Sequence, residues 1–277
     1  MRPDSVPATA PRNGRPSAEP AQAVRLNESS LIPGDRETLA AWKIAFFGAI
    51  ALTVVLPLLR PHPFLEILAF VPDGLTATFT VTLASIGLAL VLGLLAGLGR
   101  IAQTTVINRI ATVYVEVVRG IPLLVQLFYI YYALGPLLHL NGLMAAITAL
   151  SICYGAYLAE IFRAGIQSIP RGQMEAALAL GLTRAQALRR IILPQTVRVI
   201  LPPIGNEFIA LLKDSSLVSI LAVSDLLRRG REYASTTFDY LEAYTVVALI
   251  YLIMTLFFSR LVGLLEERMR THGRQHH

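Results

Sequence analysis

The sequence is short of charge, of lysine and of cysteine. Charged residues occupy 15% of its 277 positions, whereas soluble domains carry about one quarter. Arginine supplies nearly all of the basic charge, because Lys43 and Lys213 are the only lysines. The single cysteine, Cys153, cannot form a disulfide within the chain, and nothing around it suggests a thiolate metal site. These shortages argue against a soluble domain and against a fold held together by disulfides.

Recognisable catalytic and nucleotide-binding motifs are also missing. A Walker A loop needs Gly-Lys-Ser/Thr, and neither lysine follows a glycine. No H-E-x-x-H or G-x-S-x-G occurs, and the histidines are dispersed, with His139 alone and the others at His62 or near the C-terminus. We therefore expect no catalytic residue, no metal site and no cofactor in this chain.

Apolar residues dominate what is present. They make up 55% of the chain, and the mean hydropathy is +0.60. A net charge of +6 could indicate nucleic acid, but the arginines lie in short segments between apolar runs, with no basic helix interleaved with aromatics. Such loop charge is typical of proteins oriented in a bilayer. We expect lipid, and no nucleic acid, as the partner of this surface.

Six apolar segments are each close to the ~20 residues that cross about 30 Å of hydrocarbon. Backbone groups at that depth must be satisfied within the segment, so we expect helices. In the second segment, Gly93 and Gly97 predict a close helix contact. The predicted fold is an all-α integral membrane protein with about six transmembrane helices: Leu39–Leu59, Leu75–Leu98, Ile110–Leu134, Leu143–Ile161, Ile191–Leu212 and Ala243–Leu264.

The ends of the chain and its loops predict an orientation. Residues 1–38 are rich in Pro, Ala, Ser and Arg and predict a disordered tail. No A-x-A site follows the first span, 39–59, so we interpret it as retained. Seventeen Arg and Lys residues fall on the predicted inner side and four on the outer side, which places both tails, 1–38 and 269–277, in the cytoplasm. The polar stretch from Asp214 to Glu242 predicts an outer loop with a short helix.

The segment Ser168–Pro194, between the fourth and fifth spans, predicts two short cytoplasmic helices. Good helix formers fill Gln173–Leu180, and Gly181 suits the left-handed position that ends a helix. Thr183 and Gln186 have the spacing of a capping box for the second helix. By pattern alone, an amphipathic loop lying on the lipid headgroups is the alternative.

The same segment resembles the EAA loop of ABC importer permeases. Glu175-Ala-Ala is followed by Gly181 and then by Ile191-Ile-Leu-Pro194. The resemblance implies a MetI-like type I importer domain over residues 74–268, with its EAA loop at 168–194 and an extra first helix. It also implies an ATP-binding subunit dimer that binds ATP and Mg, an extracytoplasmic substrate-binding protein, and a second permease subunit, identical or paralogous. The residues carried over to the ATPase-coupling surface are Gly172, Gln173, Glu175, Ala176, Ala177 and Gly181.

Further segments resemble the polar amino acid branch of that family, which includes histidine, glutamine and arginine permeases. They begin at Arg119 (Arg-Gly-Ile-Pro-Leu-Leu-Val-Gln), at Tyr157 (Tyr-Leu-Ala-Glu) and at Lys213 (Lys-Asp-Ser-Ser-Leu). The resemblance implies ATP-driven import of an amino acid across a bacterial inner membrane. A permease of the same class for another small polar solute and an ion-coupled secondary transporter are the alternatives.

Ionisable residues in or beside the spans are candidates for the substrate pathway, because an uncompensated charge there is costly. The alternative for each is a structural ion pair or a group that reaches the headgroups. Pro202-Pro203-Ile-Gly205 predicts an interruption of the fifth span, or else only a kink. The candidates are Arg119, Glu160, Asn206, Glu207, Lys213 and Asp214.

Overall fold

The computed structural model describes residues 35–274, and the side chains of residues 39–269. Of the disordered tail predicted over residues 1–38, residues 1–34 lie outside the described residues, as do the last three residues of the chain, whereas residues 35–38 are helical, contrary to the prediction. The chain divides into two units, residues 1–41 and 42–277. Of the first unit, the structure describes only the start of helix α1, Asp35–Leu59.

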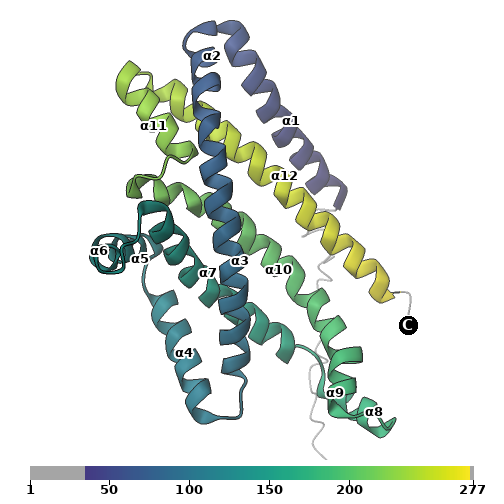
Figure 1. The fold of residues 1–277 in the computed structure, drawn as a ribbon. Coiled ribbons are helices and arrows are strands. Elements are labelled where there is room, and N and C mark those ends of the chain that lie inside the picture. Colours follow the sequence, from purple (N-terminus) through teal and green to yellow (C-terminus); the bar gives the residue numbers. More distant parts are fainter. Residues whose placement is uncertain (1–34, 275–277) are drawn as a thin grey trace, which may run out of the picture. The chain divides into compact units, whose positions relative to one another are not determined.

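The described residues are helical almost throughout and contain no strand (Figure 1). Short 3₁₀ segments lie at Val71–Asp73 and Ser215–Leu221, and π-helical segments at Tyr129–Leu134 and Leu188–Ile192. The α-helices are α1 Asp35–Leu59, α2 Pro61–Phe70, α3 Gly74–Arg100, α4 Thr105–Gly120, α5 Leu123–Phe128, α6 Gly135–Leu138, α7 Gly142–Gln167, α8 Arg171–Ala179, α9 Arg184–Ala187, α10 Leu193–Asp214, α11 Leu226–Thr237 and α12 Tyr240–Arg274.

Four stretches in the described part of the chain are long and apolar enough to cross a membrane: Leu39–Leu59, Pro61–Arg100, Gly142–Gln167 and Tyr240–Met269. The bent pair of α4 with α5–α6 would make a fifth. The remaining predicted span, α10, is a helix of 22 residues that carries several ionisable side chains. At the C-terminus, α12 continues to Arg274, so most of the segment predicted as a tail is helical.

The predicted third span, Ile110–Leu134, is wrong as a single helix. It breaks at Ile121, whose backbone is extended (φ −106°, ψ 130°), and the two helices meet at 103°. Pro122 causes the break, because its ring disfavours the helical conformation of the preceding residue. The Gln126 side chain donates to the carbonyls of Val118 and Ile121, both at 2.8 Å, and so satisfies groups that the break leaves free.

The predicted interruption of the fifth span is also wrong. Helix α10 runs from Leu193 to Asp214 with Pro202 and Pro203 inside it. The φ angle that a proline ring imposes is a helical one, and membrane helices tolerate the lost donors when neighbouring groups compensate. The prolines therefore leave the side chains beyond them in helical register.

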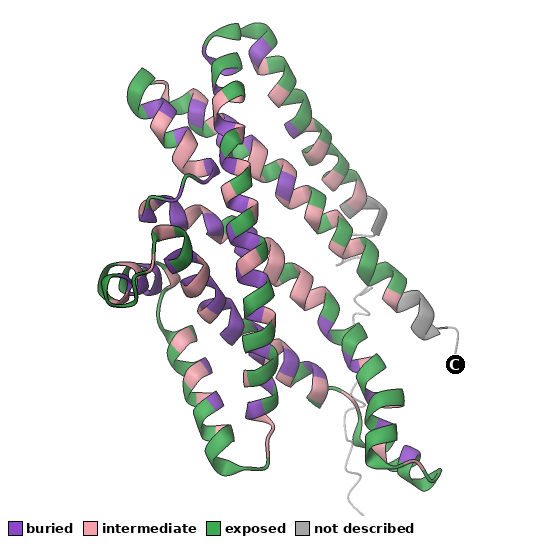
Figure 2. Ribbon diagram, in the orientation of Figure 1, coloured by how far each residue is buried: buried purple, intermediate pink, exposed green. Residues whose placement is uncertain are grey.

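Helices α3 and α7 pack closely through the predicted glycine pair. A Cβ atom on Gly93 would lie 2.6 Å from the Cβ of Leu158, and one on Gly97 would lie 2.8 Å from the carbonyl oxygen of Ala159. In the most apolar stretch of 18 residues, 61% of the residues are buried in α7, whereas 6% are buried in α1 (Figure 2). Helix α7 is therefore central to the packing, whereas α1 presents nearly all of its apolar side chains outward.

The stretch from Asp214 to Glu242 contains the predicted short helix, α11. Asp225 begins it by accepting hydrogen bonds from the backbone N–H groups of Leu227 and Arg228, both at 3.1 Å. The Asp225 side chain is fully buried, and this burial raises its pKa to about 6. The Tyr233 hydroxyl donates to Glu66 at 3.0 Å, which ties α11 to α2.

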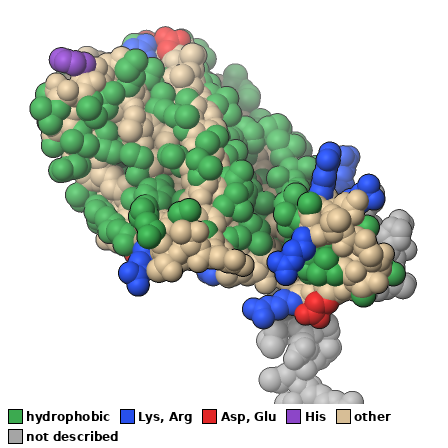
Figure 3. All heavy atoms as spheres, turned by 60° about the horizontal axis from the view of Figure 1, so that its bottom comes forward, with side chains coloured by type: hydrophobic (Ala, Val, Ile, Leu, Met, Phe, Trp, Pro, Cys, Tyr) green, Lys and Arg blue, Asp and Glu red, His purple; other side chains and the backbone are tan. Residues whose placement is uncertain are grey.

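The surface is strongly apolar. Hydrophobic side chains cover most of the face in Figure 3, and Lys and Arg lie at its margins, most densely at the lower right. Large aliphatic side chains that would be buried in a soluble protein are exposed, among them Ile44, Leu58 and Leu137 at 74–75%. An exposed apolar surface this extensive marks contact with lipid or protein.

Candidate functional site

The predicted coupling segment forms two short helices joined by a tight turn. Gly181 has φ +82°, a left-handed conformation that favours glycine. Its N–H donates to the Leu178 carbonyl at 3.0 Å, and the Leu182 N–H donates to the Ala177 carbonyl at 3.2 Å. This is the Schellman pattern of helix termination, as the position of Gly181 predicted.

The second helix of the segment begins with the predicted capping box. The Gln186 N–H donates to the Thr183 hydroxyl at 3.3 Å, and the Gln186 side chain accepts from the Thr183 N–H at 2.9 Å. Helix α9 then passes through the π-helical segment Leu188–Ile192 into α10. The coupling segment is thus joined directly to the helix that carries Glu207 and Asp214.

The residues expected on the coupling surface differ in exposure. Gly172, Gln173, Glu175 and Ala176 are exposed on α8. Ala177 is 1% exposed and packs inside the segment, so it supports the surface instead of forming it. Leu180, at the turn, is 82% exposed and was not singled out from the sequence. This leucine, beside Gly181, gives the surface an apolar point of contact.

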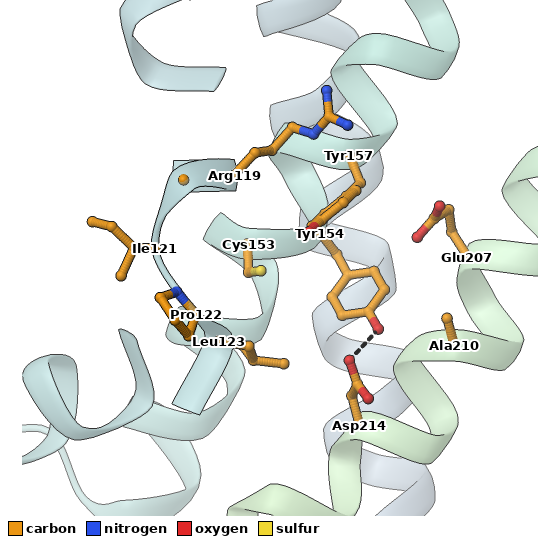
Figure 4. Close-up of a pocket in the computed structure, with 11 residues that line it drawn as sticks. Arg119, Ile121, Pro122, Leu123, Cys153, Tyr154, Tyr157, Glu207, Ala210 and Asp214 are labelled. Atoms are coloured by element: carbon orange, nitrogen blue, oxygen red, sulfur yellow. Dashed lines mark hydrogen bonds between the residues drawn. The ribbon is translucent and has the colours of Figure 1, made fainter. Parts of the chain in front are cut away.

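A second feature is a cavity of ≈ 420 Å³ between the α4–α5 break, α7 and α10 (Figure 4). The break supplies one wall, and the tyrosines of α7 and the carboxylates of α10 supply the others. Its lining residues are Arg119, Gly120, Ile121, Pro122, Leu123, Cys153, Tyr154, Tyr157, Glu207, Ala210 and Asp214.

Helical periodicity brings the polar lining together. Glu207, Ala210 and Asp214 recur at the spacing of one face of α10, and Tyr154 and Tyr157 share one face of α7. The Tyr154 hydroxyl donates to Asp214 at 2.7 Å, as the dashed line in Figure 4 shows. This bond joins α7 to α10 across the cavity.

The positively charged side chain that lines the cavity, Arg119, lies beside the α4–α5 break. Arg119 is in the last turn of α4, and its guanidinium carbon is 5.1 Å from the centre of the Tyr157 ring. This is a cation–π distance, and such a contact orients the guanidinium. The cavity therefore presents one guanidinium from α4 and two carboxylates from α10. Opposite charges on separate elements suit a zwitterionic solute.

The structure separates the six predicted pathway candidates. Arg119, Glu207 and Asp214 line the cavity, whereas Asn206 and Lys213 are exposed and do not. Glu160 lies in an ion-pair network with Arg163 and with Arg100, whose Nη1 is 2.5 Å from its carboxylate. Arg100 also approaches Glu116 at 3.5 Å, so this network ties α3, α4 and α7 together. Glu160 thus has a structural pairing here.

Sequence reasoning missed several residues of the site. Tyr157 was named only as part of a motif. Tyr154, Cys153 and the buried Gln126 had no predicted role in the site. Two tyrosines three residues apart in an apolar helix were the available signal for α7. No local pattern shows that Gln126 supports the break. Among the described residues, no group of three or more His, Cys, Asp or Glu side chains could hold a metal ion.

Comparisons with known proteins place most of the chain in one family. A family model for the "Binding-protein-dependent transport system inner membrane component" matches residues 89–271. The chain is 42% identical over 200 residues to the glutamine transport system permease protein GlnP of Escherichia coli (strain K12), which covers 70% of this chain and 91% of that protein.

Solved structures are similar in fold. A crystal structure of an amino acid ABC transporter with histidines is 41% identical, with a TM-score of 0.69 over 74% of this chain and 96% of that one. An inward-facing structure of the MetNI methionine ABC transporter is 23% identical, with a TM-score of 0.59 over 72% of this chain and 98% of that one. The second likeness concerns the fold alone.

Proposed function

The chain belongs to the family of binding-protein-dependent transport system inner membrane components, and from that premise we propose that it is the permease subunit of an ATP-driven importer for an amino acid. The coupling segment beside a charged cavity is the observation that carries the proposal. The permease crosses a bacterial inner membrane several times, with both termini and α8–α9 in the cytoplasm. The arginine distribution supports this orientation.

The energy comes from a separate pair of ATP-binding subunits, which bind ATP and Mg. These subunits receive α8 and α9, with Glu175, Ala176 and Leu180 on the exposed surface. The direct passage from α9 through the π-helical segment into α10 supports this role, because a displacement of α9 would be transmitted to the carboxylates of the cavity. ATP-driven closure of the partner then alternates the access to the cavity.

The cavity holds the amino acid during transfer. Arg119 binds the α-carboxylate, and Glu207 with Asp214 binds the α-ammonium group, since charges in a low-dielectric site need opposite charges. Tyr154 keeps Asp214 oriented through its 2.7 Å hydrogen bond. The support for this assignment is the placement of opposite charges on separate walls of one cavity.

Two further partners complete the importer. An extracytoplasmic binding protein delivers the amino acid, and a second permease subunit, identical or paralogous, faces this one. Arg119 and Tyr157 line the cavity yet are exposed, which supports a neighbouring subunit as the remaining wall.

The test is uptake in proteoliposomes that contain the permease, its ATPase and its binding protein. We expect ATP-dependent uptake of a subset of radiolabelled amino acids, without competition from the matching amines that lack an α-carboxylate. Uptake that follows an ion gradient and ignores ATP would refute the proposal. ATP-dependent uptake of a non-zwitterionic solute, with no amino acid transported, would refute the substrate class alone.

A further inference from the structure

The turn between α11 and α12 contains a strained phenylalanine. Phe238 has φ +66°, and its N–H closes α11 by donating to the Ala234 carbonyl at 2.8 Å. Helices commonly end in this left-handed conformation, but glycine usually occupies it because a side chain there is penalised. A bulky aromatic residue at such a φ is an outlier whose side chain needs a compensating contact.

Among the described residues, none supplies that contact. The side chain of Phe238 is 78% exposed. Three more large side chains follow it on the first turns of α12: Tyr240 at 45%, Leu241 at 78% and Tyr244 at 38%. We name Phe238, Tyr240, Leu241 and Tyr244 the α12 anchor patch.

The depth of the patch follows from the helices beside it. The Trp42 indole N–H donates to the Leu256 carbonyl at 2.9 Å, which fixes the level of α1 against α12. At 1.5 Å per residue, Tyr240 lies about 24 Å along α12 from Leu256, and Leu58 lies the same distance along α1 from Trp42. The patch is therefore level with the end of the apolar α1, where Arg60 follows.

Packing confirms this level independently. Phe64 and Ile67 of α2, the helix that follows α1, share a buried cluster with Ala243 and Val246 of α12. The apolar stretch of α12 also begins at Tyr240. Tyrosine and other aromatic side chains gather where hydrocarbon meets headgroups, because a ring has an apolar body and a polar edge.

We propose that the α12 anchor patch is a lipid-binding surface that inserts Phe238 and Leu241 at the headgroup–acyl boundary of the leaflet next to α11. Burial of the Phe238 side chain in lipid offsets the strain of its backbone. A turn that contacted only water would carry glycine here, because glycine adopts this φ angle without strain. Arg231, exposed on α11 and without an ion pair to any described residue, is available to a lipid phosphate. The patch holds the start of α12 at the membrane surface, together with α11, whose Tyr233 and Ala234 share a buried cluster with Ala243 and Val247 of α12.

The test uses the fact that Trp42 is the only tryptophan in the sequence. In the assembled importer, Trp42→Phe combined with Phe238→Trp leaves one tryptophan in each copy of this chain, and the emission of an importer that carries Trp42→Phe alone is subtracted to remove that of the other subunits. The importer is reconstituted in vesicles with lipids brominated at shallow or deep acyl positions. We expect loss of most of the emission with shallow bromines and a smaller loss with deep ones. Ser235→Trp in the same background, on the exposed surface of α11, is the matched control and should lose less.

Three results would overturn the proposal. They are unquenched emission at the wavelength of tryptophan in water, equal quenching at positions 235 and 238, and shielding of position 238 only after the binding protein is added. The last would assign the patch to that protein. Phe238→Gly separates strain from anchoring: in detergent its thermal unfolding temperature should equal or exceed that of the unaltered chain, since glycine relieves the φ angle. A lower temperature would show an internal packing role and also overturn the proposal. None of these readouts depends on transport.

Discussion

The coupling segment and the cavity are built in different ways. The coupling segment closes its turn and starts its second helix with hydrogen bonds between residues at most five positions apart. The cavity takes its charged and aromatic side chains from three elements, and its Tyr154–Asp214 bond joins residues 60 positions apart. One region depends on local sequence, and the other depends on how helices are arranged.

This difference has a consequence for how each region responds to change. A substitution in the coupling segment acts through one turn of backbone, so its effect should remain local and appear as lost communication with the ATPase. A substitution in the cavity alters a charge that other helices have positioned, so its effect should appear in substrate affinity.

Gly181→Val should have the largest effect. A β-branched residue at φ +82° is strained by more than the roughly 1–2 kcal/mol typical of left-handed residues, and the turn between α8 and α9 will reorganise. We expect transport-coupled ATP hydrolysis in the reconstituted complex to be abolished while membrane insertion is retained. Gly48→Val, at a helical glycine with open space around it, is the control and should leave coupling intact. Unchanged coupling in Gly181→Val would remove this turn from the docking surface.

Arg119→Gln should weaken substrate affinity next. Removing the guanidinium takes away the charge that pairs with the substrate carboxylate, and a binding loss of about 1.4 kcal/mol corresponds to a tenfold rise in KM for uptake. Lys213→Gln is the matched control, because Lys213 is exposed and does not line the cavity. Similar KM values for the two variants would contradict the assignment of Arg119 to the substrate carboxylate.

Gln126→Leu should destabilise the frame of the cavity. The change removes the two hydrogen bonds that the Gln126 side chain donates to the Val118 and Ile121 carbonyls, each worth about 0.5–1.5 kcal/mol. We expect a lower thermal unfolding temperature in detergent, measured against Gln173→Leu, which alters an exposed glutamine of α8. If the two variants unfold at the same temperature, Gln126 does not support the break.

Thr183→Ala should have the smallest effect, because it removes one half of the capping box, at about 1 kcal/mol. We expect faster hydrogen exchange at the Gln186 amide without a change in global unfolding. Thr183→Ser keeps the hydroxyl and should preserve the protection. Loss of protection throughout α10 would show that the coupling segment is less independent than its local bonds indicate.

The accuracy of prediction followed the same division. The helices of the coupling segment, the left-handed Gly181 and the Gly93–Gly97 contact were all predicted, because each depends on residues close in sequence or on the small size of a side chain. The straight third span and the interrupted fifth span were wrong. Both errors concern proline, whose effect depends on whether neighbouring groups satisfy the backbone: Gln126 does so at the break, and α10 simply continues through Pro202 and Pro203.

By itself, the sequence determined that this protein is a helical membrane protein with a capped pair of short helices between α7 and α10. Lipid demands long apolar runs with internally satisfied backbones, and a capped helix pair is specified by a few adjacent residues. Only the tertiary structure decided which charges meet. Arg119, Glu207 and Asp214 share a cavity because α4 ends at Gly120, before Pro122, while α10 stays continuous and α7 packs between them. Glu160, in contrast, forms ion pairs with Arg100 and Arg163. Those outcomes depend on angles between helices, which the spacing of residues along one chain does not contain.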